Sequence, residues 1–179
     1  MNPEPATSHA RTDASSFVSA AVERHQAALL RSAVRLLGGD LERARDVVQD
    51  TFVRLMAQPP ARVEGHVAEW LFTVCRNRSL DVLRKEGRVR RFADGQAERL
   101  TTAEPAPGRS LERAEQHAAV LRLVDHLPPH QQEVVRLKFQ NGFSYQEISR
   151  ITSLSVGNVG FILHTAIRAL RQQMAALPE

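Results

Sequence analysis

The sequence predicts an all-α protein made of two small helical domains joined by a flexible linker. Apolar residues recur at helical spacing in successive segments, and Ala, Leu, Arg, Gln and Glu, which favour helices, dominate the composition. Aromatic residues make up only 5% of the 179 residues, whereas strands usually contain more. Between residues 88 and 109 the helical pattern stops, and Gly95, Pro105, Pro107 and Gly108 interrupt the chain.

Three helices are expected in the first domain, residues 16–92, after a disordered tail at residues 1–15 that is rich in Pro, Ser, Thr and Ala. They span residues 16–37, 41–57 and 66–86, with Asp40 as a cap and Gly38-Gly39, Pro59-Pro60 and Gly87 as stops. The residues expected to face the core are Phe17, Ala21, Leu29, Ala33 and Leu36, then Leu41, Ala44, Val48, Phe52 and Leu55, then Trp70, Leu71, Val74, Leu80 and Leu83.

Residues 93–109 are interpreted as the linker, and a second helical domain is expected over residues 110–179. Its first helix, residues 110–126, is amphipathic, and Pro128-Pro129 begins a second helix that reaches Gln140 and ends at Asn141-Gly142. Ser144 and Glu147 match the capping box of a short helix that ends near residue 151. Ser155 then caps a last helix that reaches about residue 175.

The last two helices form a candidate helix-turn-helix, a motif that places its second helix in the major groove of DNA. At about 100° per residue, one face of the last helix is apolar. That face carries Val159, Leu163, Ala166, Ile167 and Leu170, and the opposite face carries Gly157, Asn158, Phe161, Thr165 and Arg168. An ordinary helical hairpin gives the same pattern, so the motif alone does not decide between DNA binding and simple packing.

The charge pattern favours an acidic partner, with nucleic acid as the first candidate. The net charge is +4, and Lys85 and Lys138 are the only lysines among 24 basic residues. Arginine offers a planar fork that suits phosphate and guanine. A genome of high GC content would also enrich Arg and Ala, so composition leaves both explanations open.

Other classes of protein are disfavoured. The seven histidines are scattered, the single Cys75 excludes a disulfide framework, and no glycine-rich phosphate loop follows a strand. We therefore expect no enzyme, no metal and no cofactor, and interpret Cys75 as a packing residue. The apolar runs are shorter than the ~20 residues that span a bilayer, and no signal sequence is visible, so a cytoplasmic location without membrane binding is expected.

Three segments resemble the extracytoplasmic-function (ECF) sigma factors, which keep only regions 2 and 4 of the larger sigma factors. They are Asp46-Val-Val-Gln-Asp-Thr-Phe52, Trp70-Leu-Phe-Thr-Val-Cys-Arg-Asn-Arg-Ser-Leu-Asp81 running into Arg84, and Leu127-Pro128 through Phe143-Ser-Tyr-Gln-Glu-Ile148 to Leu170. The resemblance covers nearly all of residues 17–170 outside the linker. It implies a transcription-initiation subunit that binds core RNA polymerase and leads it to promoter DNA.

The resemblance also implies three interfaces. The segment that starts at Asp46 resembles region 2.2, which docks on the clamp helices of the largest polymerase subunit. The segment that starts at Trp70 resembles regions 2.3 and 2.4, which melt the promoter and read its −10 element. The segment that starts at Leu127 resembles region 4, which reads the −35 element and meets the flap of the second-largest subunit.

Matching residues carry these roles over. They are Arg43, Arg45, Asp46, Gln49 and Asp50 for polymerase docking, Arg76, Asn77, Arg78, Arg84, Lys85 and Arg88 for the −10 element, and Ser155, Asn158, Phe161, His164, Thr165 and Arg168 for the −35 element. Trp70 is interpreted as a core residue rather than a base-stacking platform. Asp81 is expected to cap the helix or to pair with Arg78 or Arg84.

Region 2.2 departs from the family pattern, because Arg43-Ala44-Arg45-Asp46 stands where relatives usually have Asp-Ala-Glu-Asp. Two acids replaced by two arginines change the charge by about four units, which would weaken docking on a basic surface. We hypothesise that phosphorylation of Thr51 restores negative charge, with Arg54 holding the phosphate. Thr51 as an ordinary helix residue is the alternative, and a Ser/Thr kinase or an anti-sigma factor are both open as regulators.

The last helix also departs from the family, with Gly160, Ile162 and Thr165 where relatives commonly carry Arg. Few phosphate contacts, and weak DNA binding without polymerase, are therefore expected. The competing interpretations are a self-sufficient helix-turn-helix regulator, with residues 16–95 as a sensing or dimerisation domain, and a helical adaptor that binds only protein.

Overall fold

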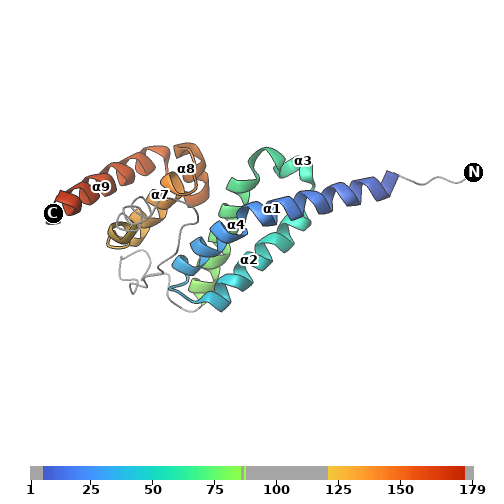
Figure 1. Ribbon diagram of the computed structural model, residues 1–179, viewed down its shortest axis with the longest axis horizontal. Coiled ribbons are helices and arrows are strands. Elements are labelled where there is room, and N and C mark those ends of the chain that lie inside the picture. Colours follow the sequence, from blue (N-terminus) through green and yellow to red (C-terminus); the bar gives the residue numbers. More distant parts are fainter. Residues whose placement is uncertain (1–5, 86, 88–120, 176–179) are drawn as a thin grey trace, which may run out of the picture. The chain divides into compact units, whose positions relative to one another are not determined.

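The structure, a computed structural model, describes residues 6–85, 87 and 121–175, with side chains from residue 15 onward (Figure 1). The chain divides into two compact units, Met1–Lys85 and Glu86–Glu179. Every regular element in the described ranges is a helix, which confirms the predicted all-α fold. The predicted linker at residues 93–109 and most of the predicted helix at residues 110–126 lie outside the described residues.

The first unit is built from α1 (Ala6–Leu36), α2 (Leu41–Met56) and α4 (Val67–Lys85), which pack against one another in pairs. Asp40 caps α2 as predicted, because its Oδ1 accepts a hydrogen bond from the backbone N–H of Arg43 at 3.1 Å. Two short elements, α3 (Pro60–Val63) and η1 (Glu64–His66), were not predicted. Pro60 cannot continue α2, yet it fits the first turn of a new helix, where its missing N–H is not needed.

Helix α1 begins at Ala6, so the predicted disordered tail is wrong for residues 6–15. Residues 6–15 contain neither Gly nor Pro, and four of them are Ala or Arg at Ala6, Ala10, Arg11 and Ala14. Extending an existing helix requires only one residue to be fixed for each added hydrogen bond, whereas starting a new helix is costly. The polar composition therefore did not prevent helix formation.

The core of the first unit differs in detail from the predicted stripes. On α2, Ala44, Val48, Phe52 and Leu55 are buried as predicted, but Leu41, at the open first position of the helix, is 42% exposed. On α4 the buried apolar residues are Leu71, Phe72, Cys75 and Leu83, whereas Trp70, Val74 and Leu80 are only half-buried. The predicted stripe on α4 was rotated, since it left out Phe72 and Ser79, which are buried on the same side as Leu71. Cys75, interpreted as a packing residue, is also buried there.

Thr51, Cys75 and Ser79 form a buried seam of small side chains between α2 and α4. The Thr51 hydroxyl donates to the Val47 carbonyl at 2.8 Å, and the Ser79 hydroxyl donates to the Cys75 carbonyl at 2.9 Å. Burial raises the pKa of the Cys75 thiol to about 12, although hydrogen bonds with Thr51 and Ser79 oppose that rise. A thiol that stays protonated at neutral pH is unreactive, as expected of a packing residue.

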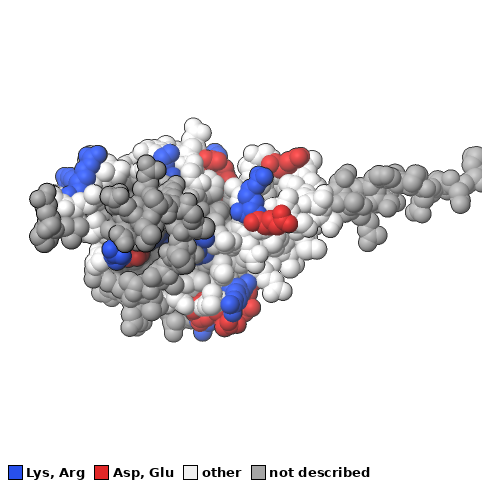
Figure 2. All heavy atoms as spheres, in the orientation of Figure 1, with Lys and Arg blue, Asp and Glu red and all other residues white. Residues whose placement is uncertain are grey.

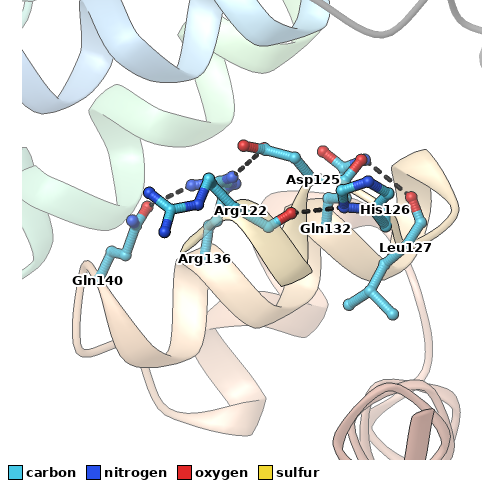
Figure 3. A network of polar contacts seen from close by, with 7 residues as sticks. All are labelled: Arg122, Asp125, His126, Leu127, Gln132, Arg136 and Gln140. Carbon is cyan, nitrogen blue, oxygen red and sulfur yellow. Dashed lines mark hydrogen bonds and ion pairs between the residues drawn. The ribbon is translucent and has the colours of Figure 1, made fainter. Parts of the chain in front are cut away.

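The second unit comprises a helical segment at residues 121–124, then α7 (Pro129–Phe139), α8 (Tyr145–Thr152) and α9 (Val156–Ala175). Arg136 is 6% exposed, and its guanidinium bonds Asp125 at 2.5 Å and Gln140 at 3.3 Å (Figure 3). The Gln132 amide donates to the carbonyls of Leu127 and Asp125, at 2.8 and 3.0 Å. These bonds connect the turn before α7 to residues of that helix and satisfy the carbonyls of Asp125 and Leu127.

Candidate functional site

The outward face of α2 is a stripe of exposed residues spaced three and four apart. The members of this α2 stripe are Glu42, Arg45, Asp46, Gln49, Val53 and Met56. Val53 is 54% exposed and Met56 is 68% exposed, so two apolar side chains continue the row that Asp46 and Gln49 begin. Val53 and Met56 were missed as candidate site residues, although an apolar residue at an outward helical position is a sequence signal for a contact surface.

The two arginines that replace acids on α2 are paired within the chain. Arg45 Nη1 lies 2.5 Å from Glu42 Oε1, and Arg43 Nε lies 3.1 Å from Asp40 Oδ2. Such exposed pairs contribute only a few tenths of a kcal/mol each. They nevertheless place a carboxylate beside each positive charge, so a partner meets paired charges rather than two bare arginines.

Thr51 does not lie where the phosphorylation hypothesis requires. Its side chain is 0% exposed and points into the seam between α2 and α4, so the expectation that it flanks the exposed docking face is wrong. Helical phase is the physical reason, since Thr51 stands four residues after Val47 and four before Leu55, which are both buried. A kinase cannot reach this hydroxyl while α2 is folded against its neighbours.

Asp50 sits at the edge of the α2 stripe and is bonded to α4 rather than free for a partner. Its Oδ2 accepts a hydrogen bond from Arg78 Nε at 2.5 Å and lies 3.4 Å from Arg54 Nε. Arg54 was expected to hold a phosphate on Thr51, but it faces Asp50. This contact unites one residue predicted for docking, Asp50, with one predicted for DNA, Arg78.

The remaining residues predicted for the −10 element are spread over the second half of α4. Asn77, Arg84 and Lys85 are exposed, Arg76 and Arg78 are half-buried, and Arg88 lies outside the described residues. Arg84 Nη1 is 2.8 Å from Asp81 Oδ1, so of the two partners considered for Asp81 the structure selects Arg84. Asn77 and Lys85 leave the clearest outward-facing polar surface on α4.

Helices α8 and α9 form the predicted helix-turn-helix. Ser144 Oγ accepts from the Glu147 N–H at 3.2 Å, and the Glu147 carboxylate accepts from the Ser144 N–H at 2.7 Å, which completes the capping box. Hydrogen bonds to the Glu147 carboxylate from the Ser144 side chain and from the Ser144 backbone N–H hold the pKa of Glu147 below its usual 4.5. Ser153 turns the chain with φ 60°, and Ser155 Oγ accepts from the Asn158 N–H at 3.2 Å to cap α9.

The two faces of α9 match the prediction closely. Val159, Leu163 and Ala166 are buried, and Ile167 and Leu170 are half-buried. The outward residues Ser155, Gly157, Asn158, Phe161, His164 and Arg168 are exposed, and Thr165 is half-buried. Phe161 is 68% exposed, so a large apolar side chain faces solvent on an otherwise polar face.

Two of the positions where relatives carry Arg do not lie open on that outward face. Ile162 is 7% exposed and belongs to the core. Gly160 lies under the Tyr145 ring, since a Cβ placed there would be 3.7 Å from that ring. Gly160 and Thr165 are half-buried and Ile162 is buried, so the structure gives no reason to expect DNA contacts at all three positions.

Charged side chains of both signs lie beside one another on the face drawn in Figure 2, which agrees with the short-range pairs described above.

Among the described helices, none combines the length and the apolar content that crossing a bilayer demands. In the same part of the chain, no group of three or more His, Cys, Asp or Glu side chains is arranged to hold a metal ion.

Comparisons with known proteins agree with this organisation. Residues 21–89 match the Sigma-70 region 2 family and residues 117–170 match the Sigma-70, region 4 family. The chain is 32% identical to the ECF RNA polymerase sigma factor EcfG of Rhodopseudomonas palustris over 149 residues, covering 83% of this chain and 78% of the relative. It is 31% identical to the ECF RNA polymerase sigma factor SigL of Mycobacterium tuberculosis over 165 residues, covering 90% of each chain.

A solved structure shares the fold of both units. The sigma factor RpoE of Bartonella quintana, in complex with the anti-sigma factor NepR, aligns with a TM-score of 0.62 at 25% identity. The alignment covers 88% of this chain and 96% of that chain. With both sigma regions matched in order and relatives above 30% identity over most of their length, the chain belongs to the family of ECF RNA polymerase sigma factors.

Proposed function

We propose that this chain acts as a sigma factor, a binding subunit rather than an enzyme, that brings core RNA polymerase to its promoters in the cytoplasm. The order of the two units carries the proposal. A first unit with an exposed α2 stripe is followed by a second unit with a capped helix-turn-helix whose outward face is open. A self-sufficient regulator would use residues 16–95 for sensing or dimerisation, and it would bind operator DNA without polymerase.

Docking on polymerase is assigned to the α2 stripe, with Asp46 and Gln49 as its polar part and Val53 and Met56 as its apolar part. Carboxylate and amide groups can bond a basic surface, while the apolar side chains would lose water on contact. Exposed apolar residues of this size add affinity only when a partner covers them. Asp50 and Arg43 are assigned to the border of this contact, because Asp50 is engaged by Arg78 and Arg43 by Asp40. Arg45 belongs to the stripe, but its charge is paired with Glu42.

Promoter DNA is assigned to two surfaces. Asn77 and Lys85 on α4 are available to the strand backbone and to unpaired bases near the −10 element. On α9, Asn158 is suited to adenine and Phe161 to a thymine methyl group in the −35 element, while Arg168 can reach phosphate or guanine. Because few cations line α9, tight promoter binding should require polymerase.

Control of this sigma factor is better explained by a protein partner than by phosphorylation of Thr51. The Thr51 hydroxyl is buried, and a phosphate there would separate α2 from α4. The related RpoE of Bartonella quintana forms a complex with the anti-sigma factor NepR, so a protein of that kind can bind a sigma factor of this fold. We therefore propose that a protein covering the exposed faces, rather than a kinase acting on Thr51, controls access to polymerase.

The experiment that tests docking uses two exposed methionines as a matched pair. Met56→Glu on the α2 stripe should weaken binding of the purified chain to core polymerase by about tenfold or more, because a charge enters an apolar contact. Met174→Glu on α9, where Met174 is 52% exposed, should bind core polymerase as the wild type does. Wild-type protein that binds promoter DNA equally well with and without core polymerase would instead favour the self-sufficient regulator.

A further inference from the structure

The contact between Asp50 and Arg78 joins the two helices that the proposed function uses for different tasks. Asp50 lies on α2, one turn after Asp46 of the α2 stripe. Arg78 lies on α4, next to the exposed Asn77. Arg78 Nε is 2.5 Å from Asp50 Oδ2, and the two side chains are 31% and 35% exposed. This is a hydrogen-bonded ion pair between helices at the border of both proposed surfaces.

The pair differs from two other charge pairs of the first unit. The Arg45–Glu42 and Arg84–Asp81 pairs each lie within a single helix, three residues apart, and their side chains are more exposed. Such pairs can form and break without moving one helix relative to another. Asp50 and Arg78 are 28 residues apart, so their bond fixes a point on α4 against a point on α2.

The surroundings of the pair limit how far either helix can adjust. Thr51 and Ser79, the residues that follow Asp50 and Arg78, are both fully buried in the seam between α2 and α4. The small seam side chains bring the helices together, and close-packed interiors leave little room for sliding. The ion pair closes the same interface at its solvent edge, where Arg54 also approaches Asp50 at 3.4 Å.

We propose that Asp50 and Arg78 are positioning residues that hold the DNA-facing part of α4 in register with the polymerase-docking stripe of α2. This inference rests on the proposed function. It reassigns both residues, since Asp50 then makes no essential contact with polymerase and Arg78 none with DNA. Their charges act on each other, and their effect on promoter melting is transmitted through the placement of Asn77 and Lys85.

The test exchanges the charges of Asp50 and Arg78. Direct contacts with polymerase and DNA predict one result, and mutual positioning of the two helices predicts another. Asp50→Asn and Arg78→Gln should each keep core polymerase binding within about threefold, yet lower promoter opening about tenfold or more, as measured by permanganate reactivity of unpaired thymines. The double variant Asp50→Arg/Arg78→Asp should recover most of the opening, because an arginine and an aspartate again face each other across α2 and α4.

Controls separate positioning from simple loss of fold. All variants are assayed well below the lowest of their melting temperatures. Asp46→Asn and Arg84→Gln are the comparison variants, because each removes a nearby charge that lies outside the pair. A merely structural role would lower core binding and promoter opening together. Non-additive effects of the two single changes on urea unfolding are also expected, and this measurement needs no polymerase.

Several outcomes would overturn the proposal. The first is a double variant whose promoter opening stays as low as that of Arg78→Gln, and the second is a loss of core binding by Asp50→Asn as large as that of Asp46→Asn. The others are single variants that open promoters normally, or strictly additive effects of the two changes on the free energy of unfolding. Wild-type protein that fails to bind core polymerase would count against the proposed function itself, while the unfolding cycle would still decide whether the two residues are coupled.

Discussion

The exposed faces of α2 and α9 differ in how they handle charge. On α2, acids and arginines alternate and pair with each other, and two apolar side chains extend the row. On α9, the outward face between residues 155 and 168 carries a single arginine, Arg168, together with Asn158, His164 and the exposed Phe161. A face with paired charges can hold a protein partner through a few apolar and polar contacts. A face with little charge gains little from phosphates and must read DNA by direct contact.

In the proposed function, the two faces make two separate contacts, one with polymerase and one with DNA, and neither contact has to be strong by itself. If α2 docks on polymerase as proposed, that binding brings the second unit to DNA at high local concentration, so α9 needs only modest affinity of its own. A helix with little charge also adds little non-specific binding, which lets base contacts dominate the choice of site. Substitutions on α2 and α9 test the packing of α2 and the roles of the two faces, beginning with the largest expected effect.

Thr51→Glu should destabilise the first unit by roughly 3–5 kcal/mol, because it places a carboxylate without a partner in the buried seam. Thermal and urea unfolding measure the loss. Thr51→Val, which keeps the shape and removes the hydroxyl, should cost only about 1 kcal/mol. If Thr51→Glu unfolded like the wild type, the seam would open readily and phosphorylation at Thr51 would again become plausible.

Phe161→Ala should reduce discrimination for the correct −35 element by about 1–3 kcal/mol, or roughly 5- to 150-fold, because a base contact is removed. The measurement is transcription by the holoenzyme from templates with an intact or a scrambled −35 element. Phe139→Ala is the matched control, since Phe139 is 63% exposed in the same unit but lies on α7. Equal loss of discrimination in both variants would show that α9 is not the reading helix.

Arg45→Glu should strengthen binding to core polymerase by up to about 1 kcal/mol, which is roughly fivefold, because it restores an acid on the α2 stripe. The gain in affinity should shrink as the salt concentration is raised, since position 45 is exposed and salt screens its charge. Binding isotherms at two ionic strengths measure it. Arg62→Glu, at an exposed position on α3, adds the same charge outside the stripe, and an equal gain there would reduce the effect to net charge alone.

Gly157→Ala and Gly160→Ala should each stabilise α9 by about 0.5–1 kcal/mol, because glycine is a poor helix former. A Cβ at Gly157 meets nothing within 4 Å, and one at Gly160 makes only ordinary contact with Tyr145. If α9 reads DNA at close range, Gly157→Ala should lower promoter affinity while Gly160→Ala should not. Thermal unfolding and holoenzyme binding, measured together, check both expectations.

The sequence by itself determined the helices, their caps and the identity of the family. Helical spacing, the Ser144–Glu147 capping box and the Asp40 cap are local features, because each depends on residues within one turn. The outward residues of α9 were predictable for the same reason. Local signals failed where a helix could simply be extended, as for residues 6–15, and where Pro60 began a new turn instead of a loop.

Only the tertiary structure decided which polar side chains are available. Thr51 and Asp50 are adjacent on one helix, yet packing against α4 buries Thr51 and joins Asp50 to Arg78. The same packing moved the core stripe of α4 toward Cys75 and Ser79. Helical periodicity gives the direction of a side chain around its own axis, but the burial and bonding of that side chain depend on the neighbouring helix, which lies far away in the sequence.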